Sequence, residues 1–167
     1  MKRKIEYIAV VFMVIILFII PGCDGDTIKP PPPEPEIFAD ISGYDSLHYE
    51  AVVMVIINKP GHQLQFSSYS DISSKHHSMV ISIFYLDTNL KAGTFNFMRD
   101  FISGKEYAVG SFIVGKGKDE KVFLSDSGTV IISELNGLTI NGSFNFFGSD
   151  KSKTEHINVQ NGILKIK

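Results

Sequence analysis

The stretch L-T-I-N-G-S-F-N-F-F, residues 138–147, alternates between two kinds of side chain. One set of alternate positions is apolar or small and the other is polar: Ile140, Gly142, Phe144 and Phe146 against Asn141, Ser143 and Asn145. Successive side chains of a β-strand point to opposite faces. The stretch therefore predicts an antiparallel strand with its aromatic face in a core and its polar face in solvent.

A second stretch, A-V-V-M-V-I-I at residues 51–57, is continuously apolar and rich in β-branched side chains. It ends at N-K-P-G, residues 58–61, which has the composition of a turn. A buried helical segment is the alternative, but the β-branching and the Pro-Gly stop favour a strand. Because no position of the run is polar, we expect both faces of this strand to be covered.

Further short strands follow at hairpin spacing. They are expected at residues 64–67, 79–85, 94–97, 108–114, 121–124, 128–134 and 157–167. Turn-forming sequences separate them at residues 87–93, 115–117, 125–128, 136–137, 148–150 and 161–162. No segment after residue 22 shows a helical apolar period of helix length. The chain is therefore predicted to be all-β, an antiparallel sandwich or a lipocalin-like barrel of about 8–10 strands.

The first 22 residues have the pattern of a cleaved signal helix. A cationic start at residues 1–4 precedes an apolar stretch at residues 8–20, which is short of the roughly 20 residues of a spanning helix. Ile20-Pro21-Gly22-Cys23 then resembles the lipobox of bacterial lipoproteins, although Pro21 departs from the usual Ala, Ser or Thr. The resemblance implies that Cys23 is acylated, as with palmitate, and becomes the N-terminus after cleavage.

The alternative is an uncleaved membrane anchor with an incidental cysteine. Cys23 is the only cysteine of the chain and lies where lipidation requires one. A single cysteine also excludes a disulfide framework within the chain. We therefore expect attachment to a membrane through N-terminal acyl chains.

The residues after Cys23 resemble a sorting signal. Asp24 and Asp26 are similar to the acidic export signals of surface lipoproteins in the Bacteroidetes, which implies an outer-membrane or cell-surface location. By the proteobacterial rule, an Asp directly after the lipidated cysteine implies retention at the inner membrane instead. A third interpretation is that these carboxylates only keep a tether soluble.

The segment K-P-P-P-P-E-P-E, residues 29–36, predicts an extended polyproline II spacer, because consecutive prolines fix φ and lack N–H donors. The expected organisation has three parts. Residues 1–22 are a lipoprotein signal peptide, residues 23–36 are a lipidated cysteine with an acidic, Pro-rich tether, and residues 37–167 are a single β-domain.

The charge of the chain argues against one class of partner. Removing residues 1–22 takes away three basic residues and one acidic residue, so the formal net charge moves from −2 to −4. Binding of nucleic acid requires clustered cations that neutralise phosphates. No such cluster is present, and we expect no nucleic-acid partner.

The sequence carries no strong catalytic, cofactor or metal signature. His76 and His77 are interpreted as part of a solvated loop, because adjacent histidines of a strand would point to opposite faces and share no metal. Glycoside hydrolysis needs two carboxylates at a fixed separation. Six carboxylates are candidates for such a pair, but most of them are assigned to turns: Asp87, Asp100, Asp119, Glu120, Asp126 and Glu134. There is no Gly-x-Ser-x-Gly elbow. We therefore expect no catalytic residues, no cofactor and no metal.

The aromatic side chains are the remaining candidates for a ligand-binding site. The chain has 13 Phe, 6 Tyr and no Trp, which is unusual for a carbohydrate-binding module. The alternating Phe positions predict core packing. Five tyrosines are weak candidates for facing a ligand, with core or rim packing as the default for each: Tyr44, Tyr49, Tyr69, Tyr85 and Tyr107.

Four motifs of the chain resemble a family of small lipid-anchored β-proteins of Bacteroidetes, classed as a domain of unknown function. They are L-K-A-G-T-F-N-F at 90–97, S-G-T-V-I-I at 127–132, I-N-G-S-F-N-F at 140–146 and V-Q-N-G-I-L at 159–164. The resemblance spans residues 79–164 and implies a fold rather than an activity. The first and third motifs also echo each other, which is either an internal duplication or a short pattern that arose twice.

These observations favour a surface or outer-membrane lipoprotein that acts as a non-enzymatic binding or interaction module of an envelope complex. The alternative is a lipocalin-like carrier of a small apolar ligand; an enzyme ranks third. An interior filled by Phe95, Phe97, Phe144 and Phe146 would favour the interaction module. An open mouth with a lined cavity would favour the carrier.

Overall fold

The computed structural model describes residue 34 and residues 36–167, except residues 73, 88, 101 and 138. The expected signal peptide, the lipidation site Cys23 and the sorting residues Asp24 and Asp26 lie outside the described residues. All of the secondary structure below belongs to one compact unit, Pro33–Lys167.

The described chain consists of nine β-strands and one short 3-10 turn. They are β1 (Glu36–Gly43), β2 (Leu47–Asn58), β3 (Gln63–Ile72), β4 (Lys75–Phe84), β5 (Gly93–Asn96), β6 (Tyr107–Val114), the turn η1 (Gly117–Asp119), β7 (Lys121–Asn136), β8 (Thr139–Ser149) and β9 (His156–Ile166). The chain is therefore all-β, as predicted.

Eight of these strands close into an antiparallel barrel. The order β7-β6-β4-β3-β2-β1-β9-β8 returns to β7 through the β7–β8 pairing, and β5 pairs with β7 outside this ring. With β5 set aside, each barrel strand pairs with its neighbours along the chain, and β1–β9 closes the ring. This is the up-and-down arrangement of a lipocalin-like barrel. The barrel alternative of the prediction is confirmed.

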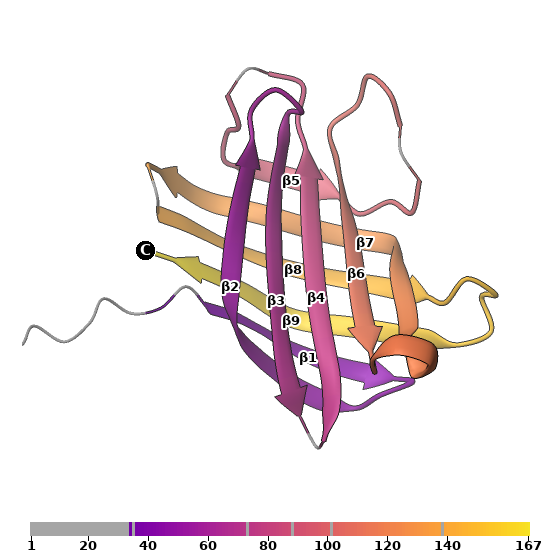
Figure 1. Ribbon diagram of the computed structural model, residues 1–167. Helices are drawn as coiled ribbons and strands as arrows, with labels where there is room; N and C mark the ends of the chain where they lie inside the picture. Colours follow the sequence, from indigo (N-terminus) through magenta and orange to yellow (C-terminus); the bar gives the residue numbers. More distant parts are fainter. Residues whose placement is uncertain (1–33, 35, 73, 88, 101, 138) are drawn as a thin grey trace, which may run out of the picture. The chain divides into compact units, whose positions relative to one another are not determined.

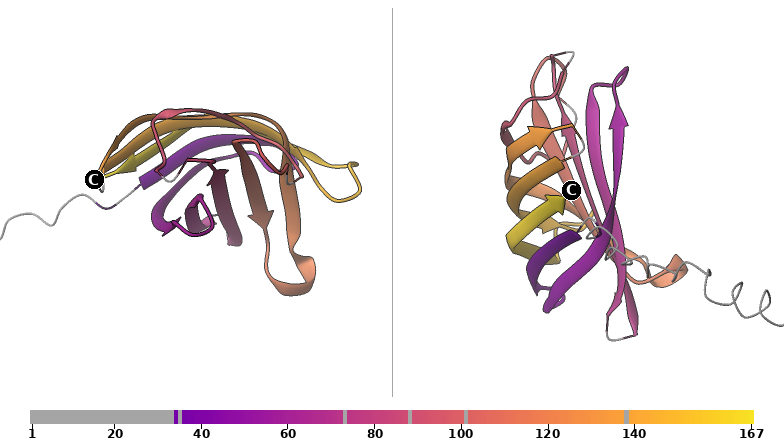
Figure 2. Two further views of the ribbon diagram at one scale, coloured as in Figure 1. Left: turned by 90° about the horizontal axis from the view of Figure 1, so that it is seen from above. Right: turned by 90° about the vertical axis from the view of Figure 1, so that its left-hand side faces the viewer.

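The barrel has two walls whose strands run in crossing directions (Figure 1). We call β3, β4, β6 and the Val53–Asn58 half of β2 the front wall, and β1, β9, β8, β7 and β5 the rear wall (Figure 2). Strand β2 belongs to both, because Leu47–Val52 pairs with β1 and Val53–Asn58 pairs with β3. Crossed walls of this kind enclose a core between their inner faces.

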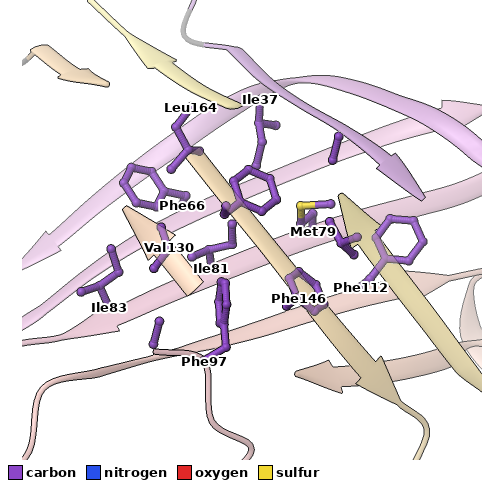
Figure 3. Close-up of a cluster of buried hydrophobic side chains, with 14 of the residues drawn as sticks. Ile37, Phe66, Met79, Ile81, Ile83, Phe97, Phe112, Val130, Phe146 and Leu164 are labelled. Atoms are coloured by element: carbon purple, nitrogen blue, oxygen red, sulfur yellow. The ribbon is translucent and has the colours of Figure 1, made fainter. Parts of the chain in front are cut away.

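Side chains fill the interior of the barrel (Figure 3). Phe95, Phe97, Phe144 and Phe146 are all at most 5% exposed. Room for two of these rings comes from Gly110 on β6, where an added Cβ would lie 3.1 Å from the Phe97 ring and 3.2 Å from the Phe146 ring. The core is therefore packed with aromatic rings from both walls.

The polar groups of Tyr49 and Ser68 are accommodated in this core by hydrogen bonds. The Tyr49 hydroxyl lies 2.9 Å from Ser68 Oγ, and Ser68 donates to the Met79 carbonyl at 3.3 Å. Burial raises the pKa of Tyr49 to about 12. The hydroxyl therefore stays neutral at ordinary pH and acts as a packing and hydrogen-bonding group.

Two predicted turns lie inside strands instead. Residues 125–128 are part of the continuous strand β7, and residues 161–162 are part of β9; both strands shift register at these places. Gly128 has φ +130° and Asn161 has φ +52°. A β-bulge uses the same positive-φ residues as a turn, so the local sequence does not separate the two.

The two echoing segments lie on opposite sides of β7. Thr94 and Ser143 both lie opposite Ile131, and Phe95 and Phe144 both lie opposite Val130. The echo thus places like side chains at like positions along β7, with one copy on the outer strand β5 and the other on the barrel strand β8.

Candidate functional site

The apolar run of β2 is covered on one face only. Val53 is 2% exposed and faces the core, whereas Val52, Met54 and Ile56 on the outer face are 55%, 65% and 44% exposed. The prediction that both faces are covered is wrong for the described chain. The run has the composition of a doubly covered strand, yet no described part of the chain packs on its outer face.

The outer face of the whole front wall continues this pattern across the register. Met54 lies opposite Ser67, Ser67 opposite Val80, and Val80 opposite Ser111. We call the following residues the uncharged face: Val52, Met54, Ile56, Gln65, Ser67, Tyr69, Ser78, Val80, Ser82, Val109, Ser111 and Ile113. None of these side chains ionises near neutral pH. A face without charges across four strands is uncommon on a solvent-exposed sheet.

A shallow hollow of about 430 Å³ lies on the uncharged face. Met54 and Tyr69, whose side chains are exposed, line it together with three serines. Its lining consists of Val52, Val53, Met54, Ser67, Ser68, Tyr69 and Ser78. The hollow has the size and chemistry to receive one or two apolar side chains of another surface.

Charged residues border one end of the uncharged face. Asp71 lies 2.9 Å from His76 Nδ1 and 3.8 Å from Lys116 Nζ, and the Tyr69 ring stacks on His76 with ring centroids 6.0 Å apart. The hydrogen bond from His76, together with the Lys116 charge, holds the pKa of Asp71 below its ordinary value. An apolar centre with a charged rim is the usual anatomy of a protein interface.

The adjacent histidines lie at the start of strand β4, not in a loop, and they occupy opposite faces of it. His76 is on the outside, whereas His77 is 1% exposed, with Nε2 3.1 Å from Asp45 and its ring stacked on Phe112. Burial raises the pKa of Asp45, but hydrogen bonds from His77 and the Ser46 N–H outweigh it and hold the pKa below its ordinary value. The loop interpretation is wrong, and the opposite-face argument holds.

A second hollow lies beside Arg99 in the segment after β5. The Arg99 guanidinium donates from Nη2 to the carbonyl and hydroxyl oxygens of Ser149, at 2.6 and 2.8 Å, and its Nε lies 2.9 Å from Asp126. Asp126 in turn accepts from the Ser149 hydroxyl at 2.6 Å. These hydrogen bonds and this ion pair hold the segment against β7 and β8, so we assign the Arg99 cluster a structural role.

The remaining candidate residues are spread over the molecule. Asp87 pairs with Lys91, Glu134 accepts from Asn141, and Asp119 lies in η1 between β6 and β7. Of the five tyrosines, Tyr49, Tyr85 and Tyr107 are buried, whereas Tyr44 and Tyr69 are exposed. Only Tyr69 belongs to the uncharged face.

The described residues contain no group of three His, Cys, Asp or Glu side chains that could hold a metal ion. Within the same part of the chain, no helix has the length and apolar character to cross a membrane.

Comparisons of the chain with protein-family models, with curated proteins and with solved structures gave no match.

Proposed function

We propose that this chain is a lipid-anchored protein of the bacterial outer membrane or cell surface, whose barrel is a non-enzymatic interaction module. The uncharged face of the front wall is its binding surface, and a protein of the envelope is its partner. The observation that carries the proposal is the exposure of Val52, Met54 and Ile56 on β2, at the border of a sheet face that holds no charge.

The energetics of the face support this assignment. Covering exposed Val, Ile and Met side chains yields roughly 25 cal/mol for each Å² of apolar area removed from water. No ion on the face has to be desolvated in return, which is the main cost of burying a charged surface. The centres of protein interfaces are depleted of charge for the same reason.

The size of the face is suited to the centre of an interface. Four strands about 4.8 Å apart, with three alternate positions along each, span on the order of 400 Å². A standard interface buries about 800 Å² on each partner. The uncharged face therefore supplies about half of a standard contact, and the charged rim near Asp71, His76 and Lys116 supplies more.

The carrier alternative receives support from the barrel topology alone. Carriers of this architecture hold their ligand in an open lumen. Here Phe95, Phe97, Phe144 and Phe146 are buried in the core cluster, so a ligand would have to displace packed rings. The interior therefore favours the interaction module.

Three sequence features support the proposed location at a membrane. The lipobox-like Ile20–Cys23 segment, the acidic Asp24 and Asp26, and the Pro-rich segment before β1 together describe a protein held at a membrane by acyl chains on a spacer. The motif resemblance to lipid-anchored β-proteins of Bacteroidetes supports the outer membrane or cell surface over the inner membrane.

The proposed binding surface is tested by crosslinking in intact cells. The native chain and a Val80→Lys variant are treated with an amine- or carboxyl-reactive crosslinker, purified and analysed for attached proteins. Val80 is at the middle of the uncharged face, and a lysine there requires desolvation of its charge in the complex. We expect the variant to lose a protein that the native chain captures.

The matched control is Asn145→Lys, which adds the same charge at an exposed position of β8 on the rear wall. This variant should capture the partner as the native chain does. Equal capture by the native chain and by Val80→Lys would contradict the assignment of the face.

A further inference from the structure

One half of β2 has a free edge. Val53–Asn58 pairs with β3 on one side, and no described strand pairs with its other side. This half is the outermost strand of the front wall (Figure 1), and the view from that side shows it with no described strand alongside (Figure 2). Unpaired N–H and C=O groups along an exposed strand are sites for pairing with another chain.

Residues 30–35, directly before β1, are chemically unable to complete this edge. Strand β1 begins at Glu36, opposite Val52, so extending the same register backwards would set residues 30–35 against Val53–Asn58. The sequence there is P-P-P-P-E-P. Proline has no N–H to donate to a β-ladder. Glu34, the only non-proline of the six, lies outside any strand.

The free edge lacks the usual protective features. Its sequence, V-M-V-I-I-N, contains no charge, no proline, no glycine and no bulge, whereas native edges are normally protected by one of these. The opposite border of the front wall is covered: Met98 donates to the Ala108 carbonyl at 2.9 Å, and Gly110 donates to the Ser125 hydroxyl at 2.9 Å. The β2 edge is thus the open border of this wall.

We propose that this edge pairs antiparallel with the same edge of a second copy of the chain, forming a two-fold symmetric dimer. Antiparallel pairing about a two-fold axis sets each strand against its own sequence, so only uncharged side chains meet. Met54 and Ile56 of the two copies then stack on the outer face, and the shared ladder joins the two front walls into one sheet. The contact also protects the apolar edge from open-ended association.

This inference goes beyond the proposed function, because it uses the backbone edge of β2 and a copy of the chain as partner. It has a consequence for the uncharged face, since the two faces become one surface of twice the width. A partner that itself presents two copies of its binding site can then engage both chains at once, which raises its avidity.

The dimer is tested by cysteine crosslinking of the full chain in membranes or detergent, with a short bis-maleimide. Met54→Cys and Ile56→Cys lie on the edge strand and should give crosslinked dimers. Val80→Cys lies on the same outer face but two strands away, and should give no more dimer than the unsubstituted chain, whose single cysteine, Cys23, is expected to be acylated.

A charge variant separates the edge from the face. Ile57 is 49% exposed but does not belong to the uncharged face, so Ile57→Lys brings like charges together only in the edge-paired dimer. We expect it to lower crosslinking of the Met54→Cys chain by about tenfold, while the unfolding midpoint and capture of the envelope partner persist.

Two results would overturn the edge-paired dimer. They are no dimer above the unsubstituted chain at either edge position, or equally strong crosslinking through Val80→Cys. An error in the proposed binding surface would give a different result. In that case Val80→Lys would leave capture of the partner intact, whatever the edge variants do.

Discussion

At the scale of single residues, glycine and phenylalanine together account for the closed interior. The Phe97 and Phe146 rings, with centroids 5.1 Å apart, lie over Gly110. The Phe144 ring lies over Gly162, where an added Cβ would be 2.5 Å from it. Aromatic rings covering glycines of neighbouring strands are a recurrent device in curved β-structures. In this barrel the device leaves side chains where a carrier would have a cavity.

The packing of Phe146 leads to a stability prediction. Phe146→Ala removes a ring that is 1% exposed and should lower the free energy of unfolding by about 3–5 kcal/mol. The neighbouring Phe147 is 43% exposed and serves as the matched control. Phe147→Ala should cost a small fraction of that amount. Urea denaturation checks both, and equal losses would mean that the interior is not packed as described.

The carboxylate of Asp150 leads to a prediction about acid. Hydrogen bonds from the Ser152 hydroxyl and from the backbone N–H groups of Glu155 and Thr154 lower its pKa to about 2. A carboxylate with a depressed pKa in the folded state stabilises it above the unfolded pKa of about 4, and this contribution is lost as the pH falls towards 2.

Asp150→Asn should therefore reduce the dependence of unfolding on pH between about 4 and 2. Thermal unfolding of the native chain and the variant across that range measures the difference. Parallel pH profiles for the two proteins would show that Asp150 is not held in this way.

At the scale of the elements, the two faces of β2 differ in burial, so substitutions on the two faces should differ in their effect on stability. Val53 faces the core and Met54 faces outwards. Val53→Lys buries a charge without a partner and should destabilise the fold by at least 3 kcal/mol. Met54→Lys should change stability by under about 1 kcal/mol, because its side chain stays in solvent. A larger loss of stability from Met54→Lys than from Val53→Lys would mean that Met54, and not Val53, faces the core.

The strands were largely predictable because their alternation is a local property. The pattern of residues 138–147 predicts the buried Ile140, Phe144 and Phe146 of β8, and the structure confirms them. The register shifts between Ser125 and Ser127 in β7 and near Asn161 in β9 were not predictable, because turns and bulges favour the same residues. Whether a strand continues through such a residue depends on its partner strands.

The uncharged face was predictable only in part. The apolar run of residues 51–57 predicts burial on two faces, but no described part of the chain covers its outer face. The missing signal is the absence of charge at alternate positions of several strands, such as Gln65, Ser67 and Tyr69 in β3. These positions become one surface only through the pairing of β3 with β2 and β4.

At the scale of the whole molecule, the proposed function gives the N-terminal segment and the barrel separable roles, attachment to a membrane and binding of a partner. Cys23→Ser removes the thiol that accepts the acyl chain and should abolish incorporation of labelled palmitate and attachment by lipid. The double variant Asp24→Asn with Asp26→Asn is the control: it should keep the label and lose surface exposure to an added protease. Palmitate incorporation into the Cys23→Ser chain would refute the lipidation site.

The proposed function requires a barrel that presents its outer surface to a protein and encloses no ligand. Native mass spectrometry of the intact chain, purified gently from its own envelope, checks both requirements at once. We expect a mass of the lipidated chain alone, of its dimer, or of either with a whole partner protein. A small bound mass that is lost on denaturation would indicate a ligand in the lumen and would rule out the packed interior.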